Sequence, residues 1–396
     1  MSLPHAHPIT LQPWQVIGAG ICALILTVGL ARFAYTPLLP LMRVDAGLSA
    51  AQGGWLATFN YLGYLLGTLL AARVGDMQQK FRFYRIGLVL AVVATALMGA
   101  TTQPWLWGLL RFVAGLSSTA GLLLASGLVL NWLLANKQRP RLGLHFAGLG
   151  LGIVVSGLAT GLLAGHAHSS AQWAWLGLLG AMFLVPAWFW MPPPTPSSAA
   201  QAAQAPPPPS RRWRQLLVAA YFCAGIGFVV SATFIVAILE QTPAFGGHGS
   251  AVWVLVGLAA VPSTFAWDRI AARLGLIRAL MLAFTLQAAS FVLPLLDNGL
   301  AAGLGSALLF GLTFAGIVSL TLTVVGRHYP HNPAKAMANL TLSYGVAQIL
   351  APALAGTLAR SSGSYQASLL LAAIFMAIGI VLLAAMPDDA GDRAPR

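Results

Sequence analysis

The sequence predicts an all-α membrane protein with twelve transmembrane helices arranged as two six-helix pseudo-repeats. Hydrophobic residues make up 58% of the 396 residues, charged residues only 7%, and the mean hydropathy is +0.80. Soluble globular proteins differ sharply, since about 25% of their residues are charged. The apolar residues also form continuous runs and do not alternate with polar ones, which argues against a β-barrel.

The predicted spans follow from the lengths of the apolar runs. Roughly 18 or more apolar residues are enough for a helix to cross the hydrocarbon core. The shortest expected span is 250–267, because Pro262 interrupts it. In chain order the expected spans are 14–41, 51–72, 83–101, 104–134, 142–165, 171–191, 213–239, 250–267, 275–296, 299–325, 338–359 and 365–386. No signal peptide is expected, because the chain's start lacks basic residues and the first run is too long.

The basic residues predict the topology. The formal net charge is +13, but all except four of the 21 Lys and Arg residues lie in alternate loops or in the C-terminal tail. The exceptions are Arg43 and Arg360 in the other loops and Arg32 and Arg111 inside spans. This asymmetry follows the positive-inside rule, so both termini are expected in the cytoplasm. The charge therefore does not indicate a nucleic-acid partner.

The chain is expected to divide once. Residues 192–212 form a Pro/Ala/Ser/Gln-rich segment that is too polar to cross a membrane, so we expect a cytoplasmic linker there. It separates an N-terminal six-helix bundle, 1–191, from a C-terminal bundle with a short tail, 213–396. A shift of 201 residues aligns the first span with the seventh, and a shift of 196 aligns the fifth with the eleventh. Such repeats commonly place a binding site between the halves.

Arg32 and Arg111 are the first candidate site residues. Both lie inside apolar spans that hold no carboxylate to pair with them. A guanidinium stays charged, and burying it near lipid is costly, so an intramembrane arginine marks a candidate substrate path. Tyr35 shares the helical face of Arg32. The alternative is that each arginine binds backbone carbonyls freed at a helix break, or extends its charged end to the membrane surface.

Several segments resemble a known family. ARFAYTPLLPLM (31–42), NYLGYLLG (60–67), YFCAGIGFVVSATF (221–234) and WDRIAARLG (267–275) are similar to YbfB/YjiJ-type bacterial transporters of the major facilitator superfamily. The resemblance implies the major facilitator fold and a location in the bacterial inner membrane, and it places spans one and four beside a central cavity. Arg111 and Gly115 match the superfamily's helix-four motif. Asp268-Arg269 matches its loop motif in part, since Thr264 replaces the glycine, and the first half lacks this motif. The Gly-Pro motif of antiporters is absent from span five, which counts against drug/proton antiport.

Other polar residues are candidates with structural alternatives. Asn60 and Tyr61 on span two, and Tyr344 and Gln348 on span eleven, could contact substrate or form hydrogen bonds between helices. His145 could titrate, or could be a satisfied interfacial residue. Glu240, at the outer end of span seven, is expected to form an outer gate pair with Arg43 or Arg32 when the protein faces inward. The gating or coupling candidates are Glu240, His145, Asp268 and Arg269.

The sequence thus favours a secondary transporter of a small organic solute, expected to be an anion, working by alternating access with proton coupling or exchange. Alternatives are an exporter of neutral or amphipathic compounds, or a non-transporting membrane sensor. Because nucleotide-binding, metalloprotease, thiol-redox and serine-hydrolase motifs are missing, no enzyme activity, catalytic residue, metal or cofactor is expected. The expected partners are a small-molecule substrate, protons and lipid, and we expect a monomer.

Overall fold

The computed structural model describes residues 11–138, 142–194, 209–240, 245–246, 248–328 and 333–387, with backbone alone for 142 and 333–339. In this part of the chain, eleven helices are long and apolar enough to cross a membrane, or twelve when one bent pair counts as a single span. The predicted all-α, twelve-span fold class is confirmed. The expected linker, 192–212, lies mostly outside the described residues, so its boundaries stay a prediction.

Six spans form the first half. Span one is α1 (Pro13–Leu24), the π-helical η1 (Ile25–Phe33) and α2 (Tyr35–Ala46). Span four is α5 (Pro104–Thr119), the π-helical η3 (Ala120–Ala125) and α6 (Ser126–Ala135). The others are α3 (Ala50–Arg73), α4 (Met77–Leu97) continued by the short 3₁₀ turn η2 (Met98–Ala100), α7 (Leu142–Leu163) and α8 (Ser169–Phe189).

The second half repeats this pattern. Its spans are α9 (Arg211–Leu239), the pair α10 (Gly249–Ala260) and α11 (Ser263–Leu274), α12 (Leu276–Leu296), α13 (Leu300–His328), α14 (Pro333–Ser362) and α15 (Gln366–Ala384). The eighth span bends by 43° between α10 and α11. Pro262 lies at this break and accounts for it, because proline removes a helical hydrogen bond and clashes with the preceding turn. The span continues to Leu274, beyond its predicted end.

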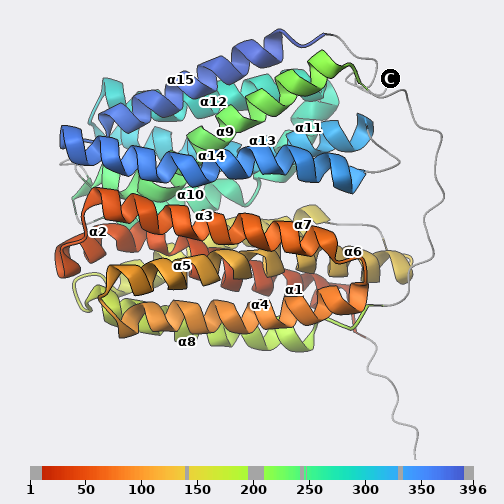
Figure 1. Cartoon of the computed structure of the whole chain (residues 1–396), viewed down its shortest axis with the longest axis horizontal. Coiled ribbons are helices and arrows are strands. Elements are labelled where there is room, and N and C mark those ends of the chain that lie inside the picture. Colours follow the sequence, from red (N-terminus) through yellow and green to blue (C-terminus); the bar gives the residue numbers. More distant parts are fainter. Residues whose placement is uncertain are drawn as a thin grey trace, which may run out of the picture.

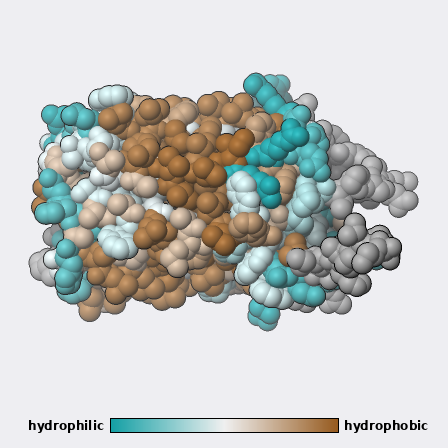
Figure 2. Space-filling view, turned by 90° about the horizontal axis from the view of Figure 1, so that it is seen from below, coloured by the Kyte–Doolittle hydropathy of each residue, from teal (hydrophilic) through white to brown (hydrophobic). Residues whose placement is uncertain are grey.

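The two halves lie side by side as two layers (Figure 1). Helices α1 to α8 form the lower layer of that view and α9 to α15 the upper, with α3 and α14 facing each other across the boundary. Helix α1 begins and α15 ends at the same end of the bundle, on the right in Figure 1. We call it the terminal end, and the other the far end. A broad apolar belt between polar ends covers the face in Figure 2, as a lipid-facing surface requires.

The π-helical segment η1 places span one closely against its neighbours. The Ala34 amide donates to the Gly29 carbonyl at 2.9 Å, a five-residue separation typical of a π-helix. Gly29 packs directly on the backbone of span five, since a Cβ there would lie 2.5 Å from the Gly152 Cα. Ser118, just before η3, donates to the Thr27 carbonyl at 3.1 Å. The two irregular segments therefore meet beside the residues considered next.

Candidate functional site

Arg32 lies in η1 and is only 4% exposed. Its guanidinium carbon lies 4.6 Å from the centre of the Tyr61 ring and 4.5 Å from that of Tyr64, both on α3. The Arg32 Nε has no hydrogen-bond partner, and no carboxylate forms an ion pair with Arg32 in the described part of the chain. Aromatic faces thus hold this cation in place, and its charge is not neutralised.

Arg111, on α5, is also buried, but its terminal nitrogens are used differently. Nη1 donates to the Ala31 carbonyl at 2.9 Å and Nη2 to the Arg32 carbonyl at 3.1 Å. Its guanidinium carbon also lies 4.4 Å from the centre of the Tyr35 ring. A π-helix leaves carbonyls without their usual α-helical partners, and Arg111 binds two of them. Its contacts therefore fix the backbone that carries Arg32.

Asn60 and Gly115 bring span four close enough for this contact. Gly115, one turn after Arg111, faces the Asn60 carbonyl so closely that a Cβ there would overlap it. The Asn60 side-chain amide donates to the Arg111 carbonyl at 2.8 Å. The four-residue spacing of Arg111 and Gly115 thus has a local reason: glycine permits the approach, and Asn60 joins the two helices.

Tyr35 has a structural contact of its own. Its hydroxyl donates to the Gly53 carbonyl on α3 at 2.8 Å, and its ring supports the Arg111 guanidinium. The side chain is 2% exposed. Tyr35 therefore joins spans one and two beside Arg32, and its predicted substrate contact stays a prediction.

The second half contributes a wall of aromatic rings. Tyr344 on α14 stacks on Tyr221 of α9, with ring centres 4.5 Å apart, and lies 5.9 Å from Phe228. Phe228 in turn meets Tyr61 of the first half edge to face at 6.5 Å. Gln348, one turn after Tyr344, is 3% exposed, and its Oε1 has no hydrogen-bond partner among the described residues. Three predicted substrate-binding residues, Arg32, Tyr61 and Tyr344, thus belong to one region between the halves, and Gln348 lies one helical turn from Tyr344.

This region reflects the internal repeat. The 201-residue shift that aligns spans one and seven places Arg32 opposite Thr233. The Tyr61 hydroxyl interacts with both side chains, so it lies between equivalent positions of the two halves. One half supplies a cation there and the other a neutral hydroxyl, which makes the region electrostatically one-sided.

Glu240 and Arg43 line a second region, at the far end. Both border a cavity of about 350 Å³, together with Pro40 and Ala237. Glu240 is half-buried and bonds to the Gly249 amide at the first turn of α10, where the helix dipole favours a carboxylate. Burial nevertheless outweighs this bond and raises the pKa of Glu240 to about 7.

The expected gate pair does not form in this conformation. Glu240 makes no ion pair within the described residues, and Arg43 donates instead to the Tyr365 hydroxyl at 3.3 Å. The Glu240 carboxylate accepts instead from the backbone amide of Gly249, which lies in the same half of the protein. The Arg43–Tyr365 bond does cross between the halves, so a polar far-end contact exists with a different acceptor.

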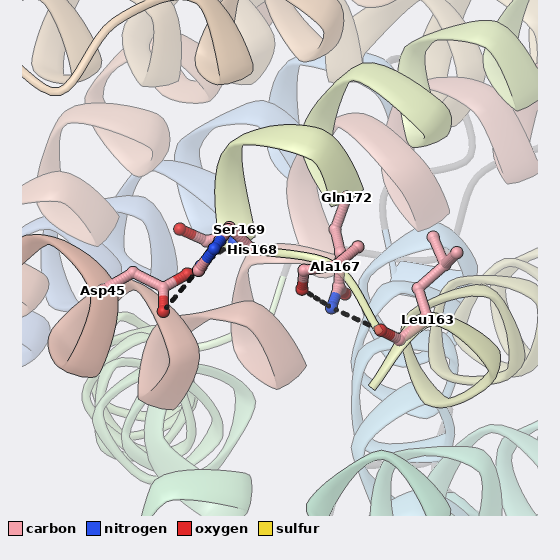
Figure 3. Close-up of polar contacts among 6 residues, drawn as sticks. All are labelled: Asp45, Leu163, Ala167, His168, Ser169 and Gln172. Atoms are coloured by element: carbon pink, nitrogen blue, oxygen red, sulfur yellow. Dashed lines mark hydrogen bonds and ion pairs between the residues drawn. The ribbon is translucent and has the colours of Figure 1, made fainter. Parts of the chain in front are cut away.

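A further polar cluster at the far end holds the first half together (Figure 3). The Asp45 carboxylate accepts from the Ser169 amide at 2.6 Å and lies 3.7 Å from His168 Nδ1. Gln172, one turn into α8, donates to the carbonyls of Leu163 and Ala167. Asp45 thus meets the positive end of the α8 dipole and fixes the end of span one to span six.

Comparison with known proteins decides the family. Residues 24–384 match the family described as "Uncharacterised MFS-type transporter YbfB", which covers most of the chain. The chain belongs to this family of major facilitator transporters. No curated protein matches it significantly.

Solved structures agree on the fold of this transporter. A crystal structure of the nucleoside transporter NupG matches with a TM-score of 0.74 at 13% identity, covering 94% of this chain and 98% of that one. A bacterial homolog of the human lysosomal transporter Spinster, described as inward-facing and unoccupied, matches with a TM-score of 0.68 at 14% identity, covering 95% and 98%. Identities this low show the fold alone.

The remaining predicted coupling residues lie apart from Arg32. His145 of the transporter is fully buried near the beginning of α7. Its Nε2 lies 2.8 Å from the Ser126 hydroxyl, and its Nδ1 faces Gly20 and has no hydrogen-bond partner in the described residues. Asp268 and Arg269 are exposed on α11, towards the terminal end. No group of three or more metal-binding side chains occurs among the described residues.

Sequence reasoning did not single out the second half's phenylalanines. Phe228, Phe310 and Phe314 form a contiguous set, with ring centres 5.4 to 6.2 Å apart. The four-residue spacing of Phe310 and Phe314 on span ten was the available signal, but helices that face lipid show the same spacing. The hydrogen bonds of Thr36 to the Ala232 carbonyl and of Thr58 to the Ile349 carbonyl, which join the halves, were also not anticipated.

Proposed function

We propose that this transporter is a secondary transporter that carries a small organic anion by alternating access, with Arg32 binding the negative charge. The observation that carries the proposal is the buried Arg32 guanidinium, which contacts tyrosine faces and no carboxylate in the described residues. Burial of a cation without a counterion is costly, and a protein retains such a residue when a ligand supplies the opposite charge.

The contrast with Arg111 supports a ligand-binding role for Arg32. Arg111 directs both terminal nitrogens to carbonyls of span one, so it has a structural task. Among the described residues the Arg32 side chain makes no hydrogen bond to the backbone, and the Arg32 carbonyl is one of the two that Arg111 binds. Arg111 thus holds the backbone of Arg32 in position, and a preorganised anion site needs such support.

The contacts between the halves support alternating access. Five side-chain hydrogen bonds that join the halves lie towards the far end: Thr36 to Ala232, Arg43 to Tyr365, Thr58 to Ile349, Thr160 to Ser250 and Trp253 to Ser156. For a protein of the bacterial inner membrane, the positive-inside rule predicts that the terminal end faces the cytoplasm. In this topology the bonds hold the outer side of the protein closed, and transport requires them to break.

Proton coupling has two candidates with different surroundings. Glu240 lies beside the far-end contacts, and its raised pKa allows it to change charge near neutrality. His145 is enclosed between spans one, four and five, where the Gly20 backbone leaves room for its ring. We favour Glu240, because its carboxyl borders a cavity that both halves line.

The aromatic wall favours a second candidate function, the transport of a neutral planar compound. Stacked rings bind uncharged ring systems as readily as charged ones. A structural neighbour, NupG, is described as a nucleoside transporter, which fits this alternative. In that case the Arg32 guanidinium would donate hydrogen bonds to a neutral acceptor, and removing its charge would weaken binding less than it would weaken the binding of an anion.

Ligand-induced thermal stabilisation of the purified transporter distinguishes the two functions. The panel contains small carboxylates, their neutral amides and nucleosides, tested on wild type, Arg32→Gln and Arg85→Gln. Arg85 is a matched control, because its guanidinium also lies 4.5 Å from two ring centres, those of Phe81 and Trp188. It lies outside the proposed site.

The anion proposal expects stabilisation by at least one carboxylate, its loss in Arg32→Gln, and its retention in Arg85→Gln. Stabilisation that amides or nucleosides produce equally in wild type and Arg32→Gln would refute it. Uptake of the stabilising compound into proteoliposomes, with and without a pH gradient, then tests transport and coupling.

A further inference from the structure

The region around Arg32 is lined by ring faces. The guanidinium carbon lies within 4.6 Å of the ring centres of Tyr61 and Tyr64, and the Phe33 ring centre is 5.5 Å away. A guanidinium presents hydrogen-bond donors around its edge and a flat apolar surface on each face. Two tyrosine rings lie close to the central carbon of this group, and Nε, on its edge, has no hydrogen-bond partner in the described residues. A carboxylate binding this edge would keep the surrounding stacking intact.

The aromatic surface continues from Arg32 into the second half. Tyr61 meets Phe228 at 6.5 Å, Phe228 meets Tyr344 at 5.9 Å, and Tyr344 stacks on Tyr221 at 4.5 Å with 27° between the planes. Phe314 supports Phe228 from α13 at 5.6 Å. Five buried rings from four spans therefore form one contiguous cluster that begins at the cation. Offset and edge-to-face aromatic contacts are favourable beyond the area that they bury.

Gln348 is a polar residue close in sequence to this cluster. It follows Tyr344 by one helical turn, is 3% exposed, and its Oε1 has no hydrogen-bond partner in the described residues. A buried amide oxygen without a partner is costly, and a ligand that donates to it removes that cost. Oε1 is an acceptor, so the complementary ligand group is a hydroxyl or an amine.

We propose that the transported anion is an aromatic carboxylate, with its carboxylate on Arg32, its ring against the tyrosines and Phe228, and a ring hydroxyl or amine donating to Gln348. This inference rests on the proposed anion transport and names the substrate class of the same site. Aliphatic carboxylates satisfy Arg32 but not the rings, whereas neutral aromatic compounds satisfy the rings but not Arg32. An aromatic carboxylate satisfies both.

A matched ligand series tests the proposal on the full-length transporter in nanodiscs. The compounds are benzoate, 4-hydroxybenzoate, cyclohexanecarboxylate, propionate and benzamide, with affinities from titration calorimetry or thermal shift. Benzoate and cyclohexanecarboxylate share a charge and a six-membered ring but differ in planarity. We expect benzoate to bind at least tenfold tighter than cyclohexanecarboxylate and propionate, and 4-hydroxybenzoate to bind tighter than benzoate in wild type but not in Gln348→Leu.

Two variants of one position separate the ring from the hydroxyl. Tyr344→Phe keeps the stacked ring, and we expect it to keep the preference for benzoate. Tyr344→Leu removes the ring, and we expect the preference over cyclohexanecarboxylate to fall to about twofold. If Tyr344→Leu does not fold, the comparison of ligands on wild type still decides.

The possible failures are distinguishable. Equal binding of cyclohexanecarboxylate and benzoate, both lost in Arg32→Gln, would overturn the aromatic inference and leave anion transport standing. Benzamide binding as tightly as benzoate, unchanged by Arg32→Gln, would overturn the proposed function itself. No binding by any compound in the series would also overturn the aromatic inference, because the proposed ligand class includes the two benzoates.

Discussion

Replacing Arg111 should destabilise the transporter, whereas replacing Arg32 should not. Arg111 makes two charge-assisted hydrogen bonds, to the carbonyls of Ala31 and Arg32. Bonds of this kind contribute roughly 1.5 to 3 kcal/mol each. In Arg111→Gln the shorter neutral amide reaches at most one carbonyl, and the other loses its donor. Relief from burying a cation offsets part of the loss, so we expect a net destabilisation of about 2 to 4 kcal/mol.

Arg32→Gln removes contacts of another kind. The wild-type guanidinium has two close ring contacts, worth about 0.5 to 2 kcal/mol, and its desolvated charge opposes them. The two effects are similar in size, so the unliganded variant should unfold at about the wild-type temperature or slightly above it.

Thermal unfolding without ligand, followed by tryptophan fluorescence in one detergent, compares the two variants. We expect a decrease in Tm on the order of 5 °C for Arg111→Gln and less than about 2 °C of change for Arg32→Gln. Arg85→Gln reports how far the loss of an arginine stacked on two rings lowers Tm by itself. An equal decrease for Arg32→Gln and Arg111→Gln would mean that Arg32 is structural, and the reasoning behind the anion site would fail.

Two other predictions concern the far end and the helix-four motif. Because burial raises the pKa of Glu240 from 4.5 to about 7, the folded state binds its proton more tightly, so Tm should fall as pH rises from 4.5 to 7. Glu240→Gln should flatten that slope in a pH series of unfolding scans, and an unchanged slope would rule Glu240 out as its source. Gly115→Ala should lower Tm by several degrees, because its Cβ would overlap the Asn60 carbonyl, whereas Gly127→Ala meets no atom within 4 Å and should be neutral or stabilising. Equal Tm values for the two alanine variants would show that spans two and four tolerate separation.

The sequence was sufficient for the fold and for part of the candidate site. Hydropathy and the placement of basic residues predict twelve spans because lipid imposes length and composition on every helix. Arg32, Tyr61 and Tyr344 were identifiable because polar groups are rare and costly inside apolar spans. The structure brings these three residues into one region, although they come from three different spans.

The partners of these residues were harder to predict. Arg111 binds carbonyls of span one, and backbone acceptors leave no mark in a side-chain pattern. Glu240 likewise bonds to a backbone amide, so opposite charges at the same end suggested a pair that this conformation lacks. Phe228 looked like any lipid-facing residue, because apolar periodicity does not distinguish a cavity wall from a helix surface in lipid.

The π-helical stretch of span one affects how any residue-by-residue scan of that helix is read. Side chains before Ile25 and after Phe33 follow the ordinary α-helical repeat of about 100° per residue, but the intervening segment changes the angular phase between them. A helical wheel drawn through all of Pro13–Ala46 therefore assigns one part of the helix to the wrong side. Cysteine-labelling data along this span should be fitted as two separate periodic segments, and their phase difference would report the π-helical stretch directly.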